Sequence, residues 1–238
     1  MNIKNLIRKT LIYCHLDLTQ NLKYDRLTNK IISKVLSENS NTIDVGAHKG
    51  EIIDEILKTA EKGKVEASEA IPSFALALRA KFSEDTRVVI NETALSDAVG
   101  TTTFNYVKNA PAYSGMKQRT YAVENPDIEK LTVKMSRLDD YGFENIDLIK
   151  IDVEGAEMHV LNGAKETIRK SKPVVLFEFG IGGSDHYGTT SDDIFNYFQE
   201  LNMGIYTLEG FVNEDMPLSR EQLYSAYHDR TDYYFVAK

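Results

Sequence analysis

Short apolar runs alternate with longer stretches of helical spacing along most of this 238-residue sequence. The alternation begins near Thr42, where a short strand-like run is followed by apolar residues at every third or fourth position. Strands that alternate with helices form a parallel sheet with helices on both faces, and ligands bind at the carboxyl ends of its strands. We therefore predict an α/β fold with a doubly wound, mainly parallel sheet.

The expected helices and strands follow from the spacing of apolar residues in each segment. Strands are predicted at 42–46, 64–70, 87–95, 147–155, 173–180, 204–210 and 232–238, and helices at 51–63, 71–84, 156–171 and 192–202. Residues 100–108 and 130–140 instead alternate with period two, which is typical of antiparallel strands, and a polar loop separates them. We predict an antiparallel insertion after the third strand.

The N-terminal part of the chain has helical spacing without strands. Apolar residues at 3–14 and 27–36 predict two helices joined by the polar segment 17–25. We predict an N-terminal helical cap at 1–40 and one main domain at 41–238. The alternative for the two helices is a contact between copies of the chain in a homo-oligomer.

Charge and cysteine content exclude some classes of function. The net charge of −8 argues against a binder of nucleic acid, which needs a basic face. The single cysteine, Cys14, excludes an intramolecular disulfide and fits a reducing compartment. Charged residues interrupt the apolar run at the N-terminus, and no segment has the length and apolarity of a membrane span. We expect a cytoplasmic protein without membrane insertion.

The segment "TIDVGAHKGEII" places Gly46 and Gly50 between the first strand and the first helix. Gly46 permits a turn that residues with a Cβ avoid, and a helix N-terminus favours a negative ligand group. The segment is either a tight strand-to-helix turn and no more, or the floor of a cofactor site. Glu69 ends the second strand about 20 residues later, where an acid accepts hydrogen bonds from ribose hydroxyls. Together they predict a ribose-bearing cofactor, although the pyrophosphate pattern G-x-G-x-x-G is absent.

Four sequence motifs resemble those of the FkbM-type family of class I S-adenosylmethionine-dependent methyltransferases. "IDVGAHKG" is similar to the family's D-V-G-A-N-x-G, "NETALSD" to N-x-A-L-S-D, and "SRLDDY" to T-L-D-D. "DLIKIDVEGAEMHVLNGA" matches its strongest signature, K-I-D-x-E-G-x-E followed by L-x-G-A. The resemblance runs from about residue 24 to the C-terminus. His48 stands where Asn is usual, and "SEA" stands where Phe-Glu-Pro is usual, with Glu69 retained.

The resemblance implies a Rossmann-like fold and S-adenosylmethionine as cofactor. Asp44 would order the glycine turn and meet the cofactor's ammonium group, directly or through water. Glu69 would bind the ribose diol. The remaining cofactor contacts implied by the motifs are Gly46, Ala47 and His48 around the methionine portion, Gly50 where helix, strand and ligand approach closely, Ala94, Leu95 and Ser96 against the adenine, and Asp152 beside the sulfonium.

Methyl transfer to oxygen needs alignment of two molecules and a base for the hydroxyl proton. The candidate bases are Asp152, Glu154, Glu178 and His186. Glu154 and Glu157 have a structural alternative, as a solvated acid and as a first-turn helix residue. A cluster of Asp152, Glu154, Glu178 and Asp185 could instead hold Mg²⁺. The family motif does not require a metal, and we predict none.

The resemblance implies methylation of a hydroxyl on a sugar, glycan or related natural product. Tyrosines near the C-terminus, in "YSAYHDRTDYY", either stack on sugar rings or belong to the core. The alternatives are a methyltransferase for a non-sugar acceptor and a noncatalytic protein with a cofactor-binding fold. A nicotinamide-dependent sugar-nucleotide enzyme would need a pyrophosphate loop and a Tyr-x-x-x-Lys pair, which the sequence lacks.

Overall fold

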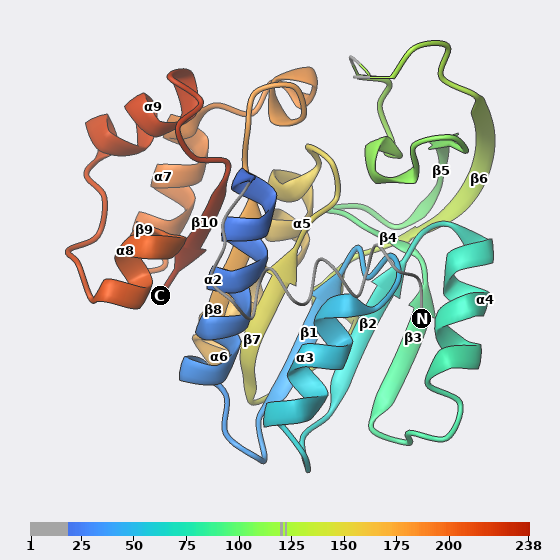
Figure 1. Cartoon of the computed structure of the whole chain (residues 1–238), viewed down its shortest axis with the longest axis horizontal. Coiled ribbons are helices and arrows are strands. Elements are labelled where there is room, and N and C mark those ends of the chain that lie inside the picture. Colours follow the sequence, from blue (N-terminus) through green and yellow to red (C-terminus); the bar gives the residue numbers. More distant parts are fainter. Residues whose placement is uncertain (1–18, 120, 122) are drawn as a thin grey trace.

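Seven strands form one central sheet in the computed structural model, which describes residues 19–119, 121 and 123–238 (Figure 1). The strand order is β3-β2-β1-β7-β8-β10-β9. The parallel strands are β1 Asn41–Val45, β2 Val65–Glu69, β3 Val88–Glu92, β7 Ile146–Ile151 and β8 Val174–Glu178. β9 Ile205–Thr207 and β10 Tyr234–Ala237 complete the sheet, and β10 is antiparallel to both of its neighbours. The predicted doubly wound, mainly parallel sheet is confirmed.

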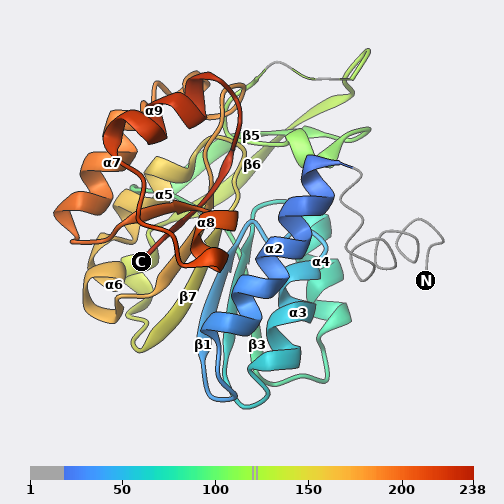
Figure 2. The ribbon, with the colours of Figure 1, turned by 60° about the vertical axis from the view of Figure 1, so that its left-hand side comes forward.

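Helices cover both faces of this sheet (Figures 1 and 2). One face carries α2 Gln20–Val35, α3 Glu51–Thr59, α4 Pro72–Lys81 and α8 Leu208–Asn213. The other face carries α5 Glu157–Gly163, α6 Lys165–Ser171, α7 Ser191–Glu200 and α9 Arg220–His228. Successive residues of β8 point to opposite faces of the sheet. Leu176 packs in the core on the side of α2 and α3, and Phe177 packs in the core on the side of α5 and α7.

Central parallel strands are buried on both faces and therefore read as nearly continuous apolar runs. β7, "IDLIKI", fits this rule, with Leu148, Ile149 and Ile151 fully buried. Lys150 is the exception, since its charged side chain is also buried in the middle of the sheet.

The predicted antiparallel insertion is present, and it belongs to a second, three-stranded sheet. β5 Gly100–Val107 pairs antiparallel with β6 Ile128–Ser136, and β4 Ala94–Leu95 pairs parallel with the end of β6. The single strand predicted at 87–95 is therefore wrong, because its last two residues leave the central sheet. Figures 1 and 2 show the insertion projecting beyond the edge at which the parallel strands end.

Two predicted boundaries differ because of side-chain caps. α2 begins at Gln20, inside the segment predicted as a polar connection, because the Thr19 side chain accepts a hydrogen bond from Leu22 N. The strand predicted at 204–210 ends at Thr207, whose side chain caps α8 by accepting from Gly210 N. α9 was not predicted, and a capping box of Ser219 and Gln222 begins it.

The helix predicted at 156–171 is interrupted. Ala164, with φ −114° and ψ 4°, separates α5 from α6. Gly163 precedes it, and a Cβ there would lie 2.0 Å from the Ser96 carbonyl oxygen. The close approach of α5 to the β4 region therefore accounts for the glycine, while the chain changes direction at the next residue.

α2 packs into the core of the main domain with four side chains, those of Tyr24, Leu27, Ile31 and Ile32. The predicted helix at 3–14 lies outside the described residues, and the boundary at residue 40 stays a prediction. None of the helices in the described part of the chain combines the length and apolarity that crossing a membrane requires.

Candidate active site

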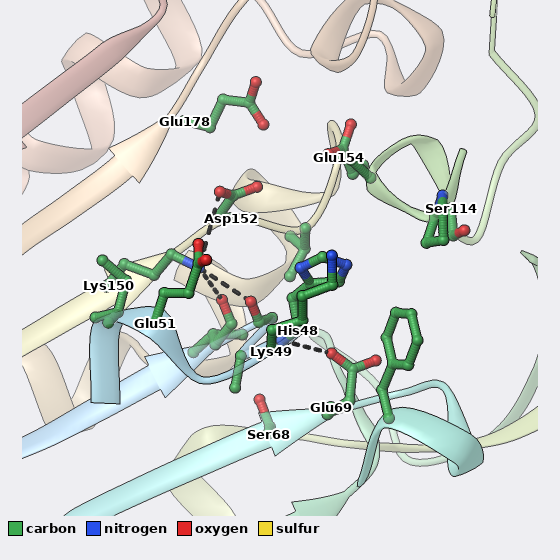
Figure 3. A pocket seen from close by; sticks show the side chains of 18 of the residues that line it. His48, Lys49, Glu51, Ser68, Glu69, Ser114, Lys150, Asp152, Glu154 and Glu178 are labelled. Carbon is green, nitrogen blue, oxygen red and sulfur yellow. Dashed lines mark hydrogen bonds and ion pairs between the residues drawn. The ribbon is translucent and has the colours of Figure 1, made fainter. Parts of the chain in front are cut away.

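A cleft of about 1140 Å³ opens at the carboxyl ends of β1, β2, β7 and β8 (Figure 3). Nine of the residues predicted from the sequence line it: Gly46, Ala47, His48, Glu69, Ala94, Leu95, Asp152, Glu154 and Glu178. These residues come from five separate segments of the chain. The strand ends therefore bring together most of the predicted site, as the parallel topology requires.

The glycine turn lies directly against the end of β7. Gly46 has φ +77°, and a Cβ at this position would lie 1.9 Å from the carbonyl oxygen of Asp152. The N–H groups of Gly46 and Ala47 both donate to the Ser68 carbonyl at 3.0 and 3.1 Å. A residue with a side chain at position 46 would force the turn away from the Asp152 backbone.

Gly50 has a different task from Gly46. It has φ +70° as the N-cap of α3, and a Cβ there would lie 2.8 Å from the side chains of Leu78 and Phe82. Gly50 does not line the cleft, so it acts in the packing of α3 against α4.

Glu69 fastens the turn to the second strand. Its carboxylate accepts hydrogen bonds from His48 N at 2.9 Å and Ile71 N at 2.8 Å (Figure 3). Burial raises the pKa of the Glu69 carboxyl, and the two N–H donors oppose that rise. Each carboxylate oxygen keeps a further lone pair that a ligand hydroxyl can use.

The His48 ring lies over the floor of the cleft, edge-on to Phe74 with the ring centroids 4.9 Å apart. Its Nε2 is buried and has no hydrogen-bond partner among the described residues. Burial, followed by the charge of Lys49, lowers the pKa of His48, so the ring is neutral near pH 7. A neutral ring nitrogen in this position can bond to a polar group of a ligand.

Asp44 lies beneath the turn and does not line the cleft. Its carboxylate is fully buried and faces Lys150, whose Nζ is 3.4 Å from Oδ1. The two residues are neighbours on β1 and β7. Burial raises the pKa of Asp44, and the Lys150 ammonium opposes that rise. In this position Asp44 orders the turn, and a direct contact with a cofactor stays a prediction.

Three carboxylates meet on the opposite side of the cleft. Asp152, Glu154 and Glu178 each offer an oxygen, and the three oxygens lie within 4.8 Å of one another. Burial, followed by the Asp152 charge, raises the pKa of Glu154 to about 8 and that of Glu178 well above its ordinary value. At neutral pH Glu154 and Glu178 therefore retain protons.

Neighbouring side chains partly offset any negative charge that these acids carry. Arg119 forms an ion pair with Glu154. The Lys150 Nζ lies 3.8 Å from Asp152 Oδ2, and Tyr234 donates its hydroxyl hydrogen to the same oxygen at 3.1 Å. The sequence reasoning missed Arg119 and Lys150, and it considered Tyr234 only for sugar stacking or the core.

Carboxylate oxygens are also the ligands that Mg²⁺ prefers. The three acids could contribute to such a site, but protein cations already contact or approach two of them. Asp185, the fourth acid considered, instead accepts a hydrogen bond from Gly182 N at 2.6 Å. Our prediction that no metal is used stays a prediction.

Three other acids, bases or hydroxyls of interest lie away from the cleft lining. His186 lies in the short helix η3 Ser184–Tyr187 and does not line the cleft, so its role as a base stays a prediction. Glu157 is buried, and its Oε1 accepts from Val153 N at 3.0 Å and Gly155 N at 3.1 Å, as its structural alternative predicts. Ser96 is buried beside the cleft without lining it.

The C-terminal tyrosines divide between the two predicted uses. Tyr233 and Tyr234 line the cleft. Tyr227 is buried with its ring stacked on Phe179 at 4.4 Å, whereas Tyr224 is exposed.

Known proteins share both the sequence pattern and the fold. Residues 44–203 match the family model described as the methyltransferase FkbM domain. The chain is 27% identical over 169 residues to the 2-O-methyltransferase NoeI of Sinorhizobium fredii, covering 65% of this chain and 68% of that protein. The crystal structure of the methyltransferase FkbM from Methylobacillus flagellatus KT aligns with a TM-score of 0.52 and 16% identity. That alignment covers 85% of this chain and 44% of the other, so this chain spans less than half of its length.

The family match extends from the end of β1 to beyond α7 and includes well over half of the sequence. It contains the glycine turn, Glu69 and the segment that ends in Asp152 and Glu154. The resemblance drawn from the motifs is thereby confirmed, and the chain belongs to the FkbM methyltransferase family.

Proposed function

We propose that this protein is an S-adenosylmethionine-dependent O-methyltransferase that acts on a hydroxyl of a sugar, glycan or related natural product. The observation that carries the proposal is the convergence of the Gly46 turn, Glu69 and Asp152 on one cleft. Family membership supports a methyltransferase, and the name of the relative from Sinorhizobium fredii supports transfer to oxygen.

The residues that line the cleft suit the chemical groups of the proposed cofactor. Gly46 lets the turn lie against the Asp152 backbone at the floor of the cleft, and Glu69 would present its carboxylate to the ribose diol. Ala94 and Leu95 offer an apolar surface to the adenine. The Asp152 carboxylate at the end of β7 suits the positively charged ammonium and sulfonium groups. When bound, the cofactor supplies a methyl group on a positively charged sulfur.

The chain's own residues would orient the acceptor and accept its proton. Asp152 is our first candidate because its carboxylate lies at the end of the central strand, with Tyr234 fixing one oxygen. Glu154 and Glu178 are next, because each offers a carboxyl oxygen within 4.8 Å of one on Asp152. A general base works best when its pKa is near the working pH, which favours Glu154.

The acceptor is the least constrained part of the proposal. A sugar is supported by the family resemblance and by two tyrosine rings, Tyr233 and Tyr234, in the cleft. A non-sugar acceptor remains the second candidate. A noncatalytic binding protein is the third, and the same cleft would then hold the cofactor without turnover.

Calorimetric titration with S-adenosylmethionine, S-adenosylhomocysteine and NAD tests the cofactor. We expect both sulfur compounds to bind and NAD to give no heat of binding. Binding of NAD alone would overturn the assignment of the cofactor.

Methyl transfer from labelled S-adenosylmethionine to an array of sugars, glycans and phenols then tests the acceptor. Transfer only to phenols would favour the non-sugar alternative, and binding without transfer to any compound would favour the noncatalytic one.

A further inference from the structure

Lys150 is a charged side chain placed inside an otherwise apolar central strand. Only 5% of the residue is exposed, and it lies between the glycine turn and Asp152 (Figure 3). An unpaired ammonium in the interior costs several kcal/mol, so a buried lysine persists only with close partners. The partners of Lys150 are the functional parts of the proposed site.

Four oxygen atoms surround the ammonium group. Nζ donates to the Gly46 carbonyl at 3.0 Å and lies 3.4 Å from the Val45 carbonyl. It is 3.4 Å from Asp44 Oδ1 and 3.8 Å from Asp152 Oδ2. Burial acts to lower the pKa of Lys150, but the two carboxylates outweigh it and raise the pKa, so the ammonium stays charged.

This geometry joins the turn and the acid through one cation. The Gly46 carbonyl belongs to the turn that would line the cofactor, and Asp152 is the first candidate for orienting the acceptor. Lys150 also supplies the one positive charge between two carboxylates. We infer that Lys150 is a positioning residue of the proposed active site, which fixes the turn and Asp152 and limits the negative charge that a bound cation meets.

The inference rests on the proposed cofactor, and it concerns how strongly the site distinguishes a positively charged sulfur from a neutral one. S-adenosylmethionine carries a sulfonium cation, whereas S-adenosylhomocysteine has a neutral sulfur. A site that binds the sulfonium charge too tightly stabilises the ground state and adds to the barrier of a reaction in which that charge disappears. Lys150 reduces this stabilisation by offsetting one carboxylate.

The test is the affinity of Lys150→Met for the two sulfur compounds, measured by calorimetry. Loss of the cation leaves the site one unit more negative, so the ratio of the dissociation constants for S-adenosylhomocysteine and S-adenosylmethionine should rise about 10-fold. Lys150→Arg keeps the charge and should keep the wild-type ratio. Lys170→Met removes an exposed lysine on the opposite face and should change neither affinity. A purely structural loosening of the site would weaken the binding of both compounds equally and leave the ratio of their dissociation constants unchanged. An unchanged ratio in Lys150→Met would therefore overturn the inference.

The double variant Asp44→Asn, Lys150→Met keeps the test informative if the single variant unfolds. It removes both members of the buried pair, so neither charge is left without its partner. We expect a folded protein whose ratio returns toward the wild-type value, with both affinities about 10-fold weaker because the Gly46 carbonyl has lost its donor. Wild-type affinities in this variant would show that Lys150 only neutralises Asp44, and would overturn the positioning role. Failure of the wild-type protein to bind either compound would instead overturn the proposed function, and this inference with it.

Discussion

Asp152 is fixed at the end of β7 by contacts on its backbone and on its carboxylate. Its N–H donates to the Val45 carbonyl at 3.1 Å, which ties it to the neighbouring strand. Tyr234 and Lys150 approach the same carboxylate oxygen, Oδ2. Asp152 also lines the cleft, where its carboxylate can orient a hydroxyl.

Replacement of Asp152 by Asn should reduce turnover by at least ~100-fold, the range expected when a general base or orienting acid is lost. The amide keeps the shape and can still accept from Tyr234, so we expect a melting temperature close to that of the wild type. Steady-state methylation of an identified acceptor, together with thermal melting, measures both quantities. Asp147→Asn, at the exposed opposite end of the same strand, is the matched control.

Two results would contradict this assignment. An Asp152→Asn protein that fails to fold would mean that the acid is structural. A folded variant with nearly the wild-type rate would place the base at Glu154 or Glu178.

Replacement of Glu69 by Ala should weaken S-adenosylhomocysteine binding by about 10- to 100-fold, because a charge-assisted contact with a diol is lost. The variant also loses the acceptor for His48 N and Ile71 N, so melting must be measured alongside calorimetric titration. Glu66→Ala changes an acid on the same strand that does not line the cleft. An unchanged dissociation constant in folded Glu69→Ala would rule out the ribose contact.

At the scale of elements, the turn between β1 and α3 depends on the end of β7. Gly46→Ala would combine an unfavourable positive φ with a clash against the Asp152 backbone, whereas Gly142→Ala meets only the first cost. Gly142 has φ +66° and nothing within 4 Å of an added Cβ. We expect Gly142→Ala to cost about 1 kcal/mol of unfolding free energy and Gly46→Ala clearly more. Denaturant unfolding compares them, and equal losses would show that the turn relaxes without strain.

Periodicity predicted the elements that carry several buried apolar residues. The strand "DLIKID" and the helices after Gly50 and Pro72 carry enough apolar residues in register to be recognised from the sequence. The C-terminal helix α7 and strands β9 and β10 were predicted, whereas the short helices α8 and α9 were not, because their ends depend on individual caps. Thr207 and Ser219 each begin a helix through one hydroxyl group. In the sequence "GIYTLEG", the strand-like spacing of apolar residues is a stronger signal than the single capping residue Thr207.

The residues of the candidate site were also only partly predictable from the sequence. Residues that end strands, such as Glu69 and Asp152, were predictable because parallel strands end at one edge. Arg119 was not, because it lies in a loop and meets Glu154 across 35 positions of sequence. Lys150 had a signal in the sequence, a single lysine inside an apolar strand two residues before an acid.

At the scale of the whole molecule, the buried acids of the site make the stability of the folded protein depend on pH. Glu157 is buried between the segment that follows β7 and the start of α5, and burial raises its pKa to about 7 from an ordinary value of 4.5. Below about pH 4.5 both the folded and the unfolded protein bind this proton. Between the two values only the folded protein keeps it, so raising the pH favours unfolding until the folded carboxyl has also ionised.

We therefore expect the wild-type protein to lose melting temperature as the pH rises from 5 to 8, with Glu157 contributing up to about 3 kcal/mol. Glu154 and Glu178 act in the same direction because their pKa values are also raised. Glu157→Gln keeps an oxygen that can accept from Val153 N and Gly155 N but cannot ionise, so it should flatten the dependence. Melting at pH 5 and pH 8 measures this, with the exposed Glu166→Gln as control. Equal losses in the Glu157→Gln variant and the wild type would mean that Glu157 is ionised in the folded protein throughout this range, and that its N–H donors outweigh the cost of burial.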